Sequence, residues 1–156
     1  MTLHRLIYVS RPFGFDTAIL GGILLGARRN NRRDGLTGAL ICRADIYLQL
    51  LEGPVPAVEA AFGRIVADDR HCDIERLTSG PVADRLFPAW EMLDDPARSW
   101  LWSAAEVAQG MVSAAAPAIL GAVFARVAAE RKLTQVAANE AGLAPAAATC
   151  PAGALV

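Results

Sequence analysis

Two segments with the composition of buried β-strands each carry one polar residue that could do chemistry. Gln49 stands between two leucines in IYLQLLEGP, residues 46–54, and Tyr8 stands in LHRLIYVS, residues 3–10. A primary amide has two donors and two acceptor sites, and a buried amide left without partners costs about 1–3 kcal/mol. A phenol can give up both a proton and an electron. We therefore expect something polar to face Gln49.

Other polar residues stand at the ends of apolar segments: the amides Asn30 and Asn31, the cation Arg64, and the charged group of Asp68, Arg70 and His71. Taken singly, an asparagine at a helix end is usually a cap, and an arginine on a helix is usually solvated. Taken together, they describe a slot with amides at one end and charged groups at another. Such a slot suits a flat, apolar heterocycle that has a hydrogen-bonding edge and a phosphate-bearing tail.

The elements that must position these residues follow from hydrophobic spacing. Asp16 suits a helix N-cap, and apolar residues recur at helical spacing as far as the polar end at residues 28–31. Pro54 and Pro56 open a second helix that reaches Val66. Strands are predicted at 3–10, 36–42, 46–51, 73–79 and 87–93, the second and third joined as a hairpin.

This order is βαββαβ with an extra fifth strand, which predicts an α+β, ferredoxin-like fold with both helices on one face of the sheet. In that fold the first and third strands are central neighbours. Tyr8 and Gln49 would then converge between the sheet and the helices, and the apolar residues Ile23, Leu24 and Ile65 would form the walls of the slot.

Residues 1–95 are therefore expected to form one domain, followed by an alanine-rich extension over residues 96–133. Helices are predicted at about 103–109 and 118–132, where they would serve as a cap or a contact between copies of the chain. Residues 134–156 are rich in Ala, Pro and Gly and are predicted to be a flexible tail.

Bulk composition excludes several classes of function. The net charge is −1 with acids and bases interspersed, which argues against binding to nucleic acid or to an anionic membrane surface. The three cysteines have neither metal-ligand nor redox-motif spacing. The N-terminal residues lack the apolar core of a secretory signal, so a cytoplasmic location is expected.

Five separated motifs, in their order and spacing, resemble the BLUF family of blue-light photoreceptors that bind FAD. They span roughly residues 3–94 and are LIYVSR, ARRNN followed by DGLTGAL, IYLQLLEGP, RIVADDRH and FPAWEM.

The resemblance implies roles for individual residues. Tyr8 corresponds to the photoactive tyrosine of the family and Gln49 to its switching glutamine. Asn30 and Asn31 correspond to asparagines that hydrogen-bond the carbonyl edge of the flavin, while Arg64, Asp68 and His71 fall where the family contacts the ring edge or the tail. Trp90 and Met92 match a Trp-x-Met motif of the fifth strand that lies near the glutamine, and both are expected to belong to the switch; which of the two faces the flavin pocket is left open.

The resemblance also implies a mechanism and partners. Excited, non-covalently bound FAD would take an electron and a proton from Tyr8 with Gln49 as relay, leaving the amide rotated or tautomerised and the flavin absorption shifted to the red. FMN or riboflavin could replace FAD in recombinant protein. The chain would not be an enzyme; it would signal to an unidentified downstream protein and form homo-oligomers.

Three other interpretations remain open at this point. A small hydrolase of the acylphosphatase kind shares the βαββαβ order, although SRPFGFDT, residues 10–17, does not supply its glycine-rich phosphate loop. A flavin-dependent oxidoreductase would also be yellow, but no GxGxxG follows a strand. A purely structural domain that pairs through its alanine-rich helices is the third.

Overall fold

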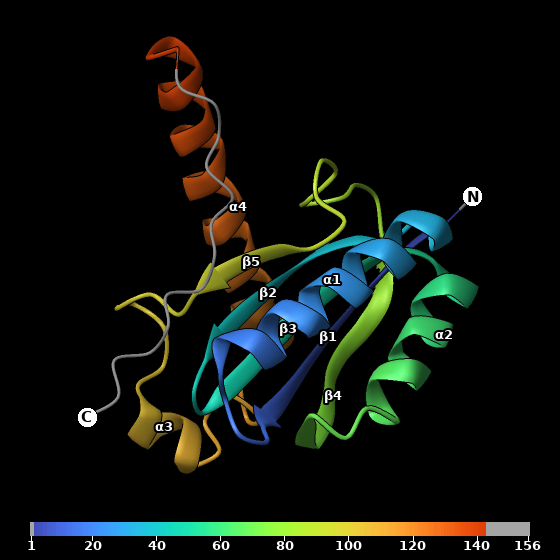
Figure 1. Cartoon of the computed structure of the whole chain (residues 1–156), viewed down its shortest axis with the longest axis vertical. Helices are drawn as coiled ribbons and strands as arrows, with labels where there is room; N and C mark the ends of the chain where they lie inside the picture. The colour runs from blue at the N-terminus through green and yellow to red at the C-terminus, as the bar shows by residue number, and fades with distance from the viewer. Residues whose placement is uncertain (1, 143–156) are drawn as a thin grey trace.

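The computed structural model describes residues 2–142 (Figure 1). Its elements, in chain order, are β1 (Leu3–Pro12), α1 (Thr17–Asp34), β2 (Thr37–Arg43), β3 (Ile46–Pro54), α2 (Val55–Val66), β4 (His71–Val82), β5 (Leu93–Pro96), α3 (Ala104–Ala108) and α4 (Pro117–Glu140).

The five strands form one sheet in the order β4-β1-β3-β2-β5. Neighbouring strands are antiparallel except for β5, which runs parallel to β2 along the edge. Helices α1 and α2 cover one face of this sheet (Figure 1). The predicted ferredoxin-like fold with an added fifth strand is confirmed, and β1 and β3 are central neighbours as expected.

Helix α1 begins and ends at residues suited to those positions. The Asp16 side chain accepts a hydrogen bond from the Ile19 backbone at 2.7 Å, and Gly35 ends the helix with a φ of 70°, which favours glycine. The prediction that the helix ends at residues 28–31 was one turn short. Arg32 and Arg33 continue it, because arginine is a good helix former and a cation near the C-terminus is stabilised by the helix dipole.

The fifth strand is shorter and later than predicted. Residues 87–92 form a loop, and the strand begins at Leu93 rather than Phe87. The Glu52 carboxylate accepts hydrogen bonds from the backbone N–H groups of Leu86 and Phe87, which therefore do not need a strand partner. The residue after them, Pro88, has no N–H to give to a ladder. Strand β4 is longer than predicted, extending to Val82.

The two faces of the sheet bury different sets of residues. Tyr8, Leu40 and Leu51 pack with Leu20 and Leu24 of α1 and Val58 of α2. Residues that alternate with them in the strands, such as Ile7 and Leu48, belong to a second cluster with Leu120 and Phe124 of α4. Helix α4 therefore caps the face opposite the predicted slot.

The C-terminal extension follows its prediction in part. Helix α3 lies where a helix was expected and begins with a capping box between Ser103 and Glu106. Helix α4 is longer than predicted and continues to Glu140, so residues 134–140 of the expected tail are helical. The rest of that tail, residues 143–156, lies outside the described residues. Within residues 2–142, no helix is long and apolar enough to cross a membrane.

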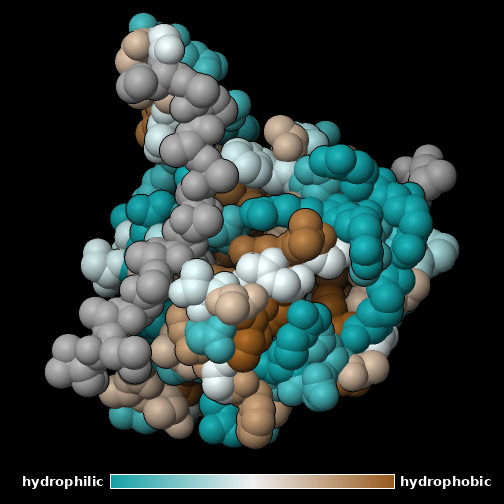
Figure 2. All heavy atoms as spheres, viewed as in Figure 1, coloured by the Kyte–Doolittle hydropathy of each residue, from teal (hydrophilic) through white to brown (hydrophobic). Residues whose placement is uncertain are grey.

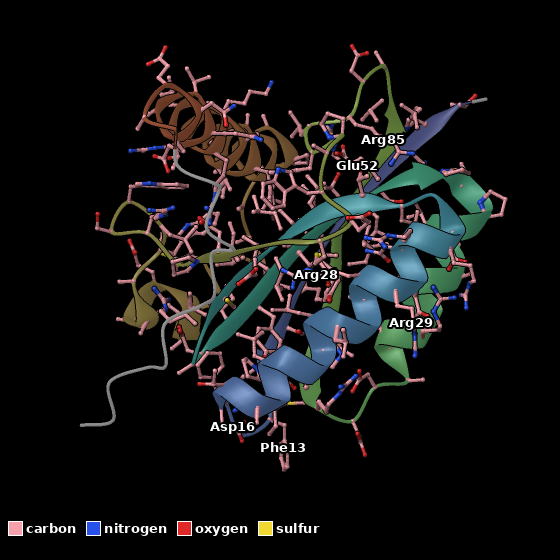
Figure 3. The ribbon with its side chains drawn as sticks, turned by 45° about the horizontal axis from the view of Figure 1, so that its top comes forward. Phe13, Asp16, Arg28, Arg29, Glu52 and Arg85 are labelled. Carbon is pink, nitrogen blue, oxygen red and sulfur yellow. The ribbon has the colours of Figure 1, made fainter. Side chains whose placement is uncertain are left out.

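Glu52 is a fully buried carboxylate at one end of β3. Arg5 of β1 pairs with it at 3.0 Å, the backbone N–H groups of Leu86 and Phe87 donate to it, and Arg85 donates to its backbone carbonyl at 2.9 Å. Figure 3 shows Glu52 and Arg85 together at this end of the sheet. This carboxylate anchors the loop that leads to β5.

Replacing Glu52 with alanine should lower the free energy of unfolding by about 3 kcal/mol, because it leaves two buried N–H groups unpaired and breaks an ion pair. Urea denaturation measures this. The control is Glu59→Ala, whose partly exposed pair with Arg76 is worth about 1 kcal/mol or less. Equal losses in the two variants would contradict the anchoring role.

Candidate functional site

Tyr8 and Gln49 lie directly opposite each other on the two central strands. They are paired residues in the β1–β3 register, and both are almost completely buried, with exposures of 3% and 6%. The Tyr8 hydroxyl donates a hydrogen bond to the Gln49 carbonyl oxygen Oε1. The polar partner expected for Gln49 is thus a phenol on the neighbouring strand.

The other end of the Gln49 amide points to the loop before β5. Its Nε2 donates to the Sδ atom of Met92 at 3.3 Å. A thioether is a weak acceptor, so this bond is easily exchanged for a stronger one. The amide still has one N–H and one acceptor site to offer, and Gln49 lines the cavity described below. It is therefore equipped to bind a further polar group.

Burial keeps Tyr8 protonated. Loss of solvation raises the pKa of its hydroxyl far above the ordinary value for tyrosine, and the nearby Asp68 carboxylate and Tyr47 act in the same direction. The group is thus a neutral phenol throughout the physiological pH range. It can serve as a proton donor, and Gln49 is its hydrogen-bond acceptor.

A cavity of about 780 Å³, part of it open to solvent, lies between the sheet and helices α1 and α2. On this face, apolar side chains surround the exposed part of α1, and hydrophilic groups border them toward the C-terminal end of α1 and over α2 (Figure 2). The cavity brings together every predicted site residue except Trp90: Tyr8, Ile23, Leu24, Asn30, Asn31, Gln49, Arg64, Ile65, Asp68, His71 and Met92.

Trp90 does not line the cavity. It packs, partly buried, against the cluster on the opposite face of the sheet. The structure therefore places Met92, and not Trp90, on the cavity side of the Trp-x-Met motif. A role of Trp90 in the switch stays a prediction. The two residues face different ways because they lie in a loop, where period-two alternation does not apply.

Asn30 and Asn31 both line the cavity but differ in burial and in hydrogen bonding. Asn31 is 4% exposed and donates from Nδ2 to the Glu91 carbonyl at 2.7 Å, which holds the loop next to Met92. This leaves its Oδ1 and its second N–H for another partner. Asn30 also lines the cavity and is partly exposed.

Charged groups lie at the α2 side of the cavity. Arg70 binds Asp68 through its guanidinium and its backbone N–H, and these bonds hold the pKa of the Asp68 carboxyl below its usual value. Asp68 is therefore an anion near neutral pH. Arg64 lines the cavity and pairs with Asp34 at 2.8 Å.

His71 lines the cavity, but both of its ring nitrogens are already bonded. Its Nε2 lies 2.8 Å from the Ile65 carbonyl and its Nδ1 lies 2.7 Å from the Ser10 hydroxyl. The carbonyl can only accept, so Nε2 carries the proton and Nδ1 accepts from Ser10. His71 therefore ties β4 to β1 and to the end of α2, and its ring is a wall of the cavity.

Seven further lining residues had no role predicted from the sequence: Gly26, Ala27, Leu40, Tyr47, Leu51, Ala61 and Arg70. Spacing alone could have found several of them. Tyr47 is two residues from Gln49 and so shares its face of β3, while Gly26 and Ala27 lie between Ile23 and Asn30 at helical spacing. Arg70 had been noted beside Asp68 without a role.

Three observations test whether the site fits a flavin. A Cβ added at Gly26 would meet no atom within 4 Å, so this glycine leaves part of the cavity open. Gln49 and Asn31 keep unused amide groups at one end, and the buried Tyr47 hydroxyl has no partner among the described residues. Ile23, Leu24 and Ile65 make part of the cavity wall apolar. These features suit a flat heterocycle with hydrogen-bonding edges, so the residues present fit the cofactor. Within residues 2–142, no group of side chains could hold a metal ion.

Residues 3–93 match a family described as BLUF, sensors of blue-light using FAD. The chain is 34% identical over 91 residues to photoactivated adenylate cyclase subunit beta of Euglena gracilis, a match that covers 56% of this chain and 10% of that protein. Subunit alpha from the same organism is 30% identical over 95 residues, which cover 59% of this chain and 9% of that one. The matched segment thus spans about a tenth of these relatives.

The comparison with solved structures also finds BLUF proteins. The BLUF protein BlrB in its dark state superposes with a TM-score of 0.68 at 28% identity, covering 83% of this chain and 97% of that one. BlsA in its ground state gives 0.60 at 29% identity and covers 62% and 66% of the two chains. A bacterial light-regulated adenylyl cyclase gives 0.59 at 27% identity and covers 72% and 33%.

These matches do not support the hydrolase alternative, and they agree with the motifs and with the Tyr8–Gln49 pair in the cavity. Because the family match covers more than half of the sequence, the chain belongs to the BLUF family of blue-light sensors that use FAD.

Proposed function

We propose that Tyr8 and Gln49 are the light switch of this BLUF domain and that FAD binds non-covalently between α1 and α2. The observation that carries the proposal is the hydrogen bond from a buried, protonated phenol to an amide that faces the cavity with donor and acceptor capacity unused. Asn30, Asn31, Arg64 and Asp68 would hold the polar edge and tail of the cofactor, and Ile23, Leu24 and Ile65 its ring. FMN and riboflavin, which share that ring, would also bind.

Bound FAD would absorb blue light and accept an electron and a proton from a donor within reach. Tyr8 supplies both, and its proton leaves through the bond to the Gln49 carbonyl. When electron and proton return to Tyr8, the Gln49 amide is left rotated or tautomerised. A rotated amide presents N–H to Tyr8 and takes its oxygen to the other side, so the bonds to Tyr8 and Met92 cannot both persist.

Tyr8→Phe should leave a yellow protein without a light-induced red shift, because phenylalanine has no hydroxyl proton to give. Gln49→Leu should also keep its flavin and lose the shifted state, since leucine offers neither donor nor acceptor. Absorption spectra before and after blue light, under air, measure both. A normal reversible shift in either variant would remove that residue from the switch.

Occupancy of the cavity can be tested separately through Gly26. Gly26→Leu places a side chain in the space that the flavin ring requires, and overpacking of about 1–3 kcal/mol corresponds to roughly 5- to 150-fold weaker binding. Titration of apoprotein with FAD measures the affinity. Gly21→Leu is the matched control: it is the same change in the same helix, at an exposed position that does not line the cavity. Equal affinities in the two variants would place the flavin elsewhere.

We further propose that the switch signals through β5 to α4. Arg28 of α1 donates to the Met92 carbonyl at 3.1 Å and pairs with Asp94 at 2.7 Å. Successive strand residues point to opposite faces. The next residue, Asp95, is completely buried and pairs with Arg131 of α4 at 2.9 Å. A shift of Met92 would thus be transmitted to the helix on the far side of the sheet.

Arg131→Met should keep the red shift and abolish light-dependent change in α4, because it removes the link between Asp95 and that helix. Hydrogen–deuterium exchange of α4 in the dark and under blue light measures the coupling. Lys132→Met, which removes a charge from the exposed neighbouring position, should behave like the parent chain. An unchanged light response of α4 in Arg131→Met would contradict this route.

The output proposed for this domain is binding rather than catalysis, because the family that it matches is described as sensors of blue-light. We propose a cytoplasmic location, an unidentified downstream signalling protein as partner, and self-association of the chain. Sedimentation of the purified protein in the dark and in the light measures the last of these; a monomer in both states would exclude it.

A further inference from the structure

Tyr47 is the second phenol of the cavity. It lies on β3 two residues before Gln49, on the same face of the strand, and is 3% exposed. The chain has two tyrosines, and both line this cavity. The mechanism above uses Tyr8 and leaves Tyr47 without a role.

The hydroxyl of Tyr47 is buried and has no hydrogen-bond partner among the described residues. Tyr8, by contrast, donates to Gln49. An unpaired buried hydroxyl is costly, and such groups in native proteins usually mark a missing water or ligand. A phenylalanine would fill the same space without that cost.

Polar neighbours of Tyr47 are already engaged. The His71 ring lies 6.4 Å from the Tyr47 ring, but both of its nitrogens bond to Ser10 and Ile65. Arg70 is held by Asp68. Burial raises the pKa of Tyr47 above the ordinary tyrosine value, partly offset by Arg70, so its hydroxyl keeps its proton at neutral pH. The ring also packs against Phe15 at 6.4 Å between centroids.

We propose that Tyr47 is a flavin-retaining residue whose hydroxyl donates a hydrogen bond to an acceptor atom of the bound flavin's ring or ribityl portion. The inference rests on the proposed binding of FAD between α1 and α2. The phosphates of FAD are a poor match for this position, because Tyr47 is buried on the sheet that floors the cavity, whereas the phosphate tail carries charge that must stay hydrated or meet cations. Arg64, with a side chain that is 43% exposed, is better placed for the tail.

This role is separate from the light switch. Tyr47 has no hydrogen bond to Gln49 or to another acceptor of the described chain, so it is not part of the relay through the Gln49 amide. Its hydroxyl should therefore contribute to affinity and leave the red shift in place. The Tyr8 hydroxyl, by contrast, should be required for the red shift.

The test is Tyr47→Phe, measured as apoprotein and after titration with riboflavin, FMN and FAD. Affinity for all three ligands should fall by about fivefold to tenfold, as expected for one neutral hydrogen bond. The thermal midpoint of the apoprotein should stay unchanged or rise, because the substitution removes an unpaired hydroxyl. The red shift of the reconstituted variant should persist. Tyr8→Phe is the matched control, because the same change at the other phenol of the cavity should abolish the red shift.

Any of the following outcomes would contradict the proposed role of Tyr47 or the function on which it rests. Unchanged affinity for all three ligands, in a protein whose parent binds flavin and cycles, removes Tyr47 from the site and leaves the proposed function intact. A loss confined to FMN and FAD would put the contact at the phosphates and overturn the ring or ribityl assignment. A lower apoprotein midpoint with unchanged affinity would show a structural role. A parent chain that binds no flavin would instead overturn the proposed function.

Discussion

The bond between Tyr8 and Gln49 is the interaction on which the rest of this structure depends. It joins side chains of the two central strands, at a depth where water cannot substitute for a lost partner. A buried amide must be satisfied in every state that the protein populates, and Gln49 has a phenol on one side and a thioether on the other. Because these partners differ in donor and acceptor character, the two orientations of the amide are not equivalent. This difference between the two orientations allows an amide to act as a switch. An ionised glutamate can only accept hydrogen bonds, so its two orientations would not differ in this way.

The surrounding fold limits which neighbouring segments can move when the Gln49 amide changes orientation. The strands next to it are fixed in the middle of the sheet, whereas β5 is a four-residue edge strand next to a loop. That loop is held by the side chains of Asn31 and Arg28 from α1 and of Glu52 from β3. Met92, which touches the amide, lies within the loop, and Asp95 on the adjoining strand meets α4. The least constrained segment beside the switch is therefore the one that leads to the opposite face of the sheet.

Sequence patterns predicted the central β1–β3 pair, the two crossover helices and most of the cavity lining, because these follow from periodicity and from motifs of fixed spacing. They failed where side-chain contacts override local propensity. Residues 87–92 have the composition of a strand, but the backbone N–H groups of Leu86 and Phe87 donate to the Glu52 carboxylate instead of to a neighbouring strand. Asp94 and Asp95 are poor strand residues, yet they form β5 because arginines from α1 and α4 neutralise them. The position of Trp90 could not be read from a motif, since it depends on where that loop turns.

The cavity itself carries a cost that binding can offset. Helix α1 has glycines at positions 21, 22 and 26, each about 1 kcal/mol less favourable in a helix than alanine, and Gly26 opens space where a side chain would otherwise pack. The unpaired Tyr47 hydroxyl and the open amide groups add to this. A ligand that fills the space binds the folded chain and not the unfolded one, so it stabilises the fold in proportion to RT ln(1 + [L]/Kd). The features that weaken the empty domain are thus the same ones that make its stability depend on the flavin.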